Sequence, residues 1–306
     1  MQAGAAQGRD NLFGSVLMMV SMAGFTLNDT CIKLLSGSLG LAQVVFLRGL
    51  LVSVLLYIVG RRLAAFSHRL SRRDLRIIAV RTLAELGATY FFLTALFHMP
   101  LPNVTAILQA LPLSVALAAA LVFKESLGWR RLSAIAVGFA GVMLIVQPGG
   151  EGFSVYALYA LAAVGCVTMR DLAARRLSPE VPSVAVAFIT ATSITFVAGL
   201  ILAFEMGEAG AGGKPLSEIS WPETRLILGA ALSVLAGYLA SVMCMRVGEI
   251  GVVAPFRYTG LLWALVLGWA VFDYWPDGME LTGATIVVAM GLFTLYRESR
   301  LRRGAA

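Results

Sequence analysis

Eight ionisable side chains lie within segments that are otherwise apolar enough to cross a membrane. The acids are Asp29, Glu85 and Asp171, and the bases are Lys33, Arg48, Arg81, Arg170 and Arg257. An ionisable group at the centre of a bilayer costs at least ~2.5–3.5 kcal/mol, so each one requires an ion-pair partner or a watery cavity. Side chains of this kind can bind a charged ligand, transfer a proton or hold helices together by ion pairs.

The order of the segments predicts two acid–base pairs at opposite depths. With the N-terminus placed in the cytoplasm, Asp29 and Arg48 both fall in the outer half of the bilayer. Asp171 and Arg257 both fall in the inner half. We expect Asp29 to pair with Arg48 and Asp171 with Arg257, as two gates on either side of the midplane would require. A purely structural salt bridge is the alternative for each pair, since desolvation cancels much of the attraction.

The other ionisable side chains also have structural explanations. Lys33 and Arg81 lie within a turn or two of a segment end and can extend their charges to the headgroups. Arg81 and Glu85 are spaced i, i+4, so they can neutralise each other on one helix face. Arg170 can face the inner headgroups. The sequence leaves these alternatives open.

Uncharged polar and aromatic side chains between the charged layers are candidates for binding a ligand. Gln109 lies in the middle of a segment, where its amide must find hydrogen bonds. Tyr and Trp in membrane proteins are more often interfacial anchors or packing residues than ligand contacts. The predicted ligand-binding set is Asn28, Tyr90, Gln109, Tyr238, Arg257, Tyr258 and Trp263. The predicted gating and charge-pair set is Asp29, Arg48, Arg81, Glu85, Arg170 and Asp171.

The elements that position these residues are predicted to be membrane helices. Of 306 residues, 59% are hydrophobic and only 13% are charged, which excludes a soluble enzyme and a disordered chain. About 20 helical residues cross a hydrocarbon core. Apolar segments of about that length recur ten times, at about 12–35, 41–60, 76–97, 101–123, 130–147, 153–174, 182–204, 224–245, 250–272 and 279–297. We therefore expect an all-α membrane protein with ten transmembrane helices.

The basic residues predict the orientation of these helices. Of the 24 Lys and Arg residues, 17 fall on one side when the N-terminus is cytoplasmic, and only Lys214 and Arg225 fall in the opposite loops. This asymmetry predicts that both termini are cytoplasmic. It also explains the net charge of +7 without nucleic acid as a partner.

Weak internal similarity divides the ten segments into two sets of five. A shift of 149 residues aligns Gln109 with Tyr258, and a shift of 142 aligns Asn28-Asp29 with Arg170-Asp171. A duplicated unit with an odd number of spans must be inverted in the membrane, as in many alternating-access carriers. The expected units are a cytoplasmic N-terminal segment at 1–11, a first repeat at 12–149, a second repeat at 150–298 and a basic cytoplasmic tail at 299–306.

Several motifs resemble the EamA repeats of the drug/metabolite transporter superfamily. The first copy runs from Ala110-Leu-Pro-Leu to Phe123-Lys-Glu125, then through Gly128-Trp-Arg-Arg131 and Gly138-Phe-Ala-Gly-Val142 to Gln147-Pro-Gly149. The second copy contains Ala254-Pro-Phe-Arg-Tyr258, Leu262-Trp263 and Trp269 to Pro276. The resemblance covers about 12–298 and implies a ten-helix inverted-repeat carrier without an attached ATPase. Many members have Gly-Glu where this chain has Lys124-Glu125, and this difference bears on the subfamily.

The resemblance implies transport but leaves the substrate open, because members move amino acids, vitamins, S-adenosylmethionine, nucleotide sugars and other metabolites. The surplus of bases favours an anionic or zwitterionic substrate. We expect a secondary active transporter of the bacterial inner membrane that works by alternating access, as a monomer or homodimer, with proton coupling left open. An intramembrane enzyme acting on a lipid-linked substrate is the alternative, and a channel is a third reading. No His lies in a segment core, and no metal-ligand spacing is present, so we predict no catalytic residue, no metal and no cofactor.

Overall fold

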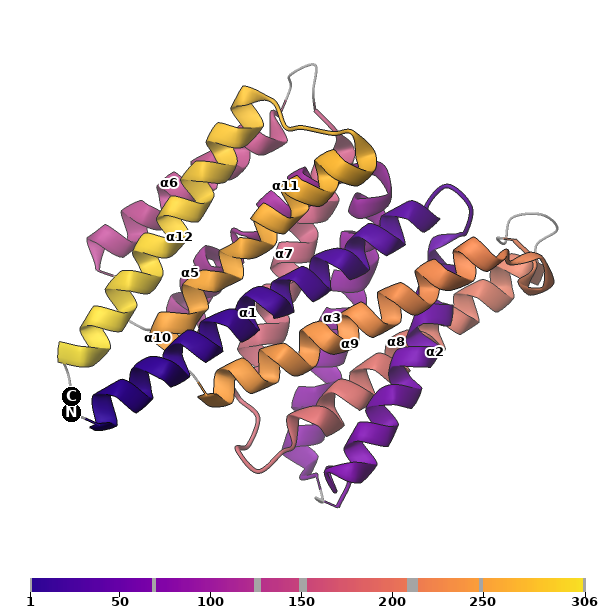
Figure 1. Ribbon diagram of the computed structural model, residues 1–306, viewed down its shortest axis with the longest axis horizontal. Coiled ribbons are helices and arrows are strands. Elements are labelled where there is room, and N and C mark those ends of the chain that lie inside the picture. The colour runs from indigo at the N-terminus through magenta and orange to yellow at the C-terminus, as the bar shows by residue number, and fades with distance from the viewer. Residues whose placement is uncertain are drawn as a thin grey trace.

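The computed structural model describes residues 2–67, 70–123, 128–148, 153–207, 214–247 and 250–304. Within these ranges the chain forms helices and short connections (Figure 1). The longer helices are α1 (Gln2–Leu35), α2 (Leu41–Arg62), α3 (Arg72–His98), α5 (Leu111–Phe123), α6 (Trp129–Val146), α7 (Val155–Ala174), α8 (Ser183–Gly207), α9 (Trp221–Val247), α11 (Thr259–Phe272) and α12 (Gly278–Gly304). The short ones are α4 (Leu101–Leu108), α10 (Ile250–Val253) and the 3-10 helices η1 (Leu216–Glu218) and η2 (Ala254–Tyr258).

The prediction of an all-α membrane protein is confirmed. In the described part of the chain, 9 helical stretches are long and apolar enough to cross a membrane, and α6 contributes a shorter apolar helix at Leu132–Val146. Large apolar side chains such as Leu83, Leu121 and Phe196 are exposed on the bundle surface. A protein in water rarely exposes so many, whereas lipid accepts them. The chain is therefore a multi-pass membrane protein.

Two of the predicted segments are interrupted near their middle. The segment predicted at 101–123 breaks at Gln109, between α4 and α5, and the segment predicted at 250–272 passes through η2, which ends at Tyr258. Pro112 and Pro255 lie close to the two breaks, and proline cannot donate the backbone hydrogen bond that a continuous helix needs. Gln109 and Tyr258 are the residues that the 149-residue shift aligns, so the two breaks occupy corresponding positions.

The helices pack mainly in four pairs: α1 with α9, α3 with α7, α2 with α8, and α6 with α12. Figure 1 shows α6 and α12 side by side at one edge of the bundle, and both chain termini together at one end. We call that end the termini end and the opposite one the far end. Since α1 starts at the termini end, the order of the helices places each residue nearer to one end or the other.

Glycines allow the backbones of two pairs to touch. A Cβ atom on Gly24 of α1 would lie 2.8 Å from the carbonyl oxygen of Ser233 in α9, and one on Gly237 would lie 3.0 Å from that of Ser21. In the other pair, a Cβ atom on Gly141 of α6 would lie 2.9 Å from the carbonyl oxygen of Gly283 in α12. No larger residue fits these positions without moving the helices apart.

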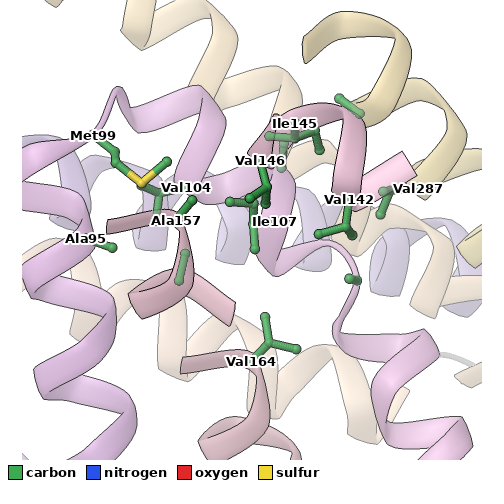
Figure 2. Packing of buried hydrophobic residues seen from close by; sticks show 14 of the residues in the cluster. Ala95, Met99, Val104, Ile107, Val142, Ile145, Val146, Ala157, Val164 and Val287 are labelled. Carbon is green, nitrogen blue, oxygen red and sulfur yellow. The ribbon is translucent and has the colours of Figure 1, made fainter. Parts of the chain in front are cut away.

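A cluster of buried apolar residues connects the α6–α12 pair to the rest of the bundle. Figure 2 shows Ile107 of α4 close to Val146 of α6, with Val164 of α7 and Val287 of α12 in the same cluster. Lipid is as apolar as these side chains, so close packing rather than escape from water holds the helices together. The cluster therefore fixes the outer pair beside the interrupted α4–α5 span.

Candidate functional site

A cavity of about 630 Å³ lies between the helices. Its described lining comes from α1, α2, α3, α4, α5, α7, α8, α9, η2 and α11. Cavities of roughly 300–1,000 Å³ are typical of small-molecule sites. The ionisable side chains of the lining are Asp29, Arg81, Glu85, Arg170, Asp171 and Arg257.

Arg170 of α7 holds two carboxylates. Its Nη1 donates to Glu85 Oε1 of α3 at 3.1 Å and to Oε2 at 3.2 Å. Its Nε donates to Asp171 Oδ1 at 2.8 Å, and Nη2 lies 2.8 Å from the same oxygen. Arg81 instead donates to Thr190 Oγ1 of α8 at 2.8 Å. The partner of Glu85 is therefore Arg170, whereas the i, i+4 spacing in the sequence favours Arg81.

Asp29 and Arg48 are linked through a third residue. Arg48 Nη1 of α2 donates to Asn28 Oδ1 at 2.9 Å, and Asn28 Nδ2 donates to Asp29 Oδ1 at 2.8 Å. Asn28 is buried. Asp29 lines the cavity, while Asn28 and Arg48 lie outside its described lining. The expected Asp29–Arg48 pair is therefore bridged by an amide that the sequence predicts to bind ligand.

The expected pair between Asp171 and Arg257 is not formed. The Asp171 carboxylate binds Arg170, its neighbour on α7. Arg257 lines the cavity with an exposed side chain and has no ion-pair partner among the described residues. The prediction is wrong because depth in the membrane does not determine which of several bases at the same level contacts a given acid. Here Arg170, the neighbour of Asp171 on α7, is that base.

Lys33 lies outside the described lining and binds backbone. Its Nζ donates to the carbonyl oxygens of Leu96 at 2.8 Å and Met99 at 2.6 Å. The last carbonyls of a helix lack partners within the helix and attract cations, so Lys33 caps the end of α3. The contact joins residues more than 60 positions apart, and nothing in the local sequence indicates it.

The uncharged candidates divide into two groups. Gln109, Tyr238 and Tyr258 line the cavity. The Tyr258 hydroxyl is buried and has no hydrogen-bond partner among the described residues. Tyr90 is 53% exposed and Trp263 is 40% exposed, and both lie outside the described lining. Sequence reasoning missed the lining threonines, for which hydroxyls within apolar helices were the available signal: Thr26, Thr89, Thr105 and Thr190.

The fold is shared with a protein of known structure. A crystal structure matches this chain with a TM-score of 0.59 at 15% sequence identity, covering 96% of this chain and 99% of the other. Residues 12–147 match the model of the EamA-like transporter family.

Curated bacterial proteins are similar over most of this chain. An S-adenosylmethionine uptake transporter of Rickettsia conorii is 23% identical over 290 residues, 94% of each chain. A pseudopaline exporter of Pseudomonas aeruginosa is 25% identical over 289 residues, 91% of this chain and 95% of the other. A riboflavin transporter of Vibrio cholerae is 25% identical over 222 residues, 72% of this chain and 71% of the other.

Proposed function

Residues 12–147 of this chain match the EamA-like transporter family, and we propose that the chain is a secondary active transporter of this family that moves an anionic or zwitterionic metabolite by alternating access. The chain is a transporter of small metabolites and not an enzyme. The observation that carries the proposal is the cavity, since helices from both halves of the chain line it with six ionisable side chains. Relatives named for S-adenosylmethionine, pseudopaline and riboflavin support a polar metabolite as the substrate.

The proposal includes two inverted five-helix repeats, at 12–149 and 150–298. The boundary between them and the Lys124-Glu125 motif lie outside the described residues. The pairing supports the repeat, because exchanging each span with its counterpart turns the α1–α9 pair into the α7–α3 pair. The corresponding breaks at Gln109 and Tyr258 support it as well.

Two serine–carboxylate contacts give further support. At the termini end, Asp74 of α3 accepts hydrogen bonds from Ser71 Oγ at 2.6 Å and from Ser178 Oγ at 3.0 Å. At the far end, Glu223 of α9 accepts from Ser220 Oγ at 2.7 Å and is also hydrogen-bonded to Ser38. The 149-residue shift aligns the first Ser-x-x-Asp with the second Ser-x-x-Glu. The first contact joins the start of α3 to the link between α7 and α8. The second joins the start of α9 to the link between α1 and α2.

Counterflow in proteoliposomes tests the proposed function. Vesicles containing the purified protein are preloaded with S-adenosylmethionine, riboflavin or an amino-acid mixture, and uptake of the same labelled compound is measured. We expect at least one compound to accumulate above protein-free vesicles. Asp171→Ala and Arg257→Ala should abolish that accumulation, whereas Arg61→Ala, outside the described lining, should not. Normal uptake by both cavity variants would show that the substrate does not pass through the cavity.

A further inference from the structure

The charges of the cavity are separated along its length. Five of the six ionisable lining residues, three arginines and two carboxylates, lie toward the termini end. Their formal sum is one positive charge. Asp29, late in α1, lies toward the far end and contributes one negative charge. Lys33 and Arg48, which account for the surplus of bases in the sequence, lie outside the described lining.

A contact between α1 and α11 allows the separation to be estimated. A Cβ atom on Gly260 would lie 3.6 Å from Met22 Sδ, so these two residues share a level. Asp29 follows Met22 by about 10 Å of α helix toward the far end. Arg257, in η2, precedes Gly260, in α11, by about 5 Å of helix toward the termini end. The two backbones are therefore separated by about 15 Å along the bundle.

Both ends retain capacity to bind a ligand. Arg257 has no ion-pair partner among the described residues, and its guanidinium can donate two parallel hydrogen bonds to a carboxylate. Among the described residues, Asp29 accepts one hydrogen bond, from Asn28 Nδ2 to its Oδ1. Between the two ends, Gln109 and Thr105 offer neutral polar groups.

We propose that the cavity binds a dipolar metabolite lengthwise, with its carboxylate at Arg257 and its cationic group at Asp29. This inference rests on the proposed transport function. A ligand with only one charge would leave the opposite end of the cavity without a counter-charge. A ligand whose two charges lie at opposite ends satisfies both.

Three probes with one carbon skeleton test this inference. 6-Aminohexanoate carries both charges at opposite ends, hexanoate carries only the carboxylate, and hexylamine carries only the cation. Affinity is measured on the purified wild-type protein by thermal shift. We expect 6-aminohexanoate to bind at least about tenfold more tightly than either of the others.

Two variants assign the ends. Asp29→Asn should weaken the binding of 6-aminohexanoate about tenfold and leave the binding of hexanoate unchanged. Arg257→Gln should weaken the binding of 6-aminohexanoate about tenfold and leave the binding of hexylamine unchanged. Asp10→Asn and Arg61→Gln make the same chemical changes outside the described lining. They should leave the affinity for all three probes unchanged. Asp29→Glu and Arg257→Lys retain the charges and should retain the ranking of the probes.

Equal affinity for the three probes, no detectable binding of any, or a preference for a single-charge probe would overturn the inference. A protein that still accumulates a metabolite in counterflow would then keep the proposed function. A protein that fails in counterflow but ranks the probes as expected would contradict the proposed function and retain the dipolar site.

Discussion

Arg170 is the residue on which the charge balance at the termini end of the cavity depends. It neutralises Glu85 across the α3–α7 contact and Asp171 on its own helix. The side chains of the three residues are 21–33% exposed, so water in the cavity screens them in part. Removal of Arg170 would leave two carboxylates close together without their shared cation.

Arg170→Gln should therefore lower the apparent stability by about 1–3 kcal/mol, less than the cost of breaking a fully buried pair. The double variant Arg170→Gln with Glu85→Gln should regain part of that loss, because it removes one of the orphaned carboxylates. Thermal unfolding of the purified variants measures both effects, with Arg61→Gln as the control. No recovery in the double variant would contradict the pairing.

At the scale of the elements, the two serine–carboxylate contacts start α3 and α9 in the same way. Asp74 and Glu223 each stand in the first turn of a helix and accept from the preceding serine. Each also reaches a serine in a link between two other helices. The contacts therefore fix the ends of spans against neighbours from the other half of the chain.

Asp74→Ala and Glu223→Ala should each cost about 1–3 kcal/mol, as expected when the hydrogen bonds of a charged acceptor are lost. Thermal unfolding is the measurement, and Asp10→Ala and Glu218→Ala are the controls. Because the proposed repeat makes the two contacts counterparts, their losses should be similar. A large loss in one variant and none in the other would count against the correspondence.

Asp277 directly precedes α12, and its hydrogen bonds predict that stability depends on pH. Its Oδ1 accepts the backbone N–H of Glu280 at 2.7 Å, and Glu280 Oε2 accepts the backbone N–H of Asp277 at 3.0 Å. The Glu280 N–H lowers the pKa of the Asp277 carboxyl below its ordinary value of 3.8. The native carboxylate thus adds stability above that value and loses it as the pH falls toward the lowered pKa.

Asp277→Asn should therefore flatten the decline in melting temperature below about pH 4, because asparagine caps a helix without titrating. Melting curves of the wild type and the variant across this range provide the measurement. Parallel declines would show that other carboxylates dominate the acid sensitivity.

The sequence predicts helix positions well and side-chain partners poorly. Lengths of apolar segments predict the membrane-crossing parts of the helices within a few residues, because a span must match the thickness of the bilayer. They do not predict that α1 begins at Gln2 or that α12 continues to Gly304, beyond the predicted segments. Pro112 and Pro255 indicate weak points, but proline alone does not distinguish a kink from a break. Partners such as Lys33 with Leu96 depend on how distant helices are rotated and paired, which segment lengths do not contain.

At the scale of the whole molecule, the distribution of basic residues predicts the orientation in the membrane. A reporter fused after Ala306 should lie in the cytoplasm, because 17 of the 24 basic residues fall on that side. A fusion truncated after Leu39, in the link between α1 and α2, should report the opposite side. The same location for both fusions would refute the orientation.

The glycine contacts have a mechanical consequence. Where backbones touch, as at Gly24 with Gly237 and at Gly141 with Gly283, sliding would drive bulkier neighbours into the facing helix. The α1–α9 and α6–α12 pairs should therefore move as rigid bodies, and the hinges of a transport cycle should lie between pairs. Spin labels placed across either pair should keep a constant separation when substrate is added, and a changing separation would locate the hinge inside the pair.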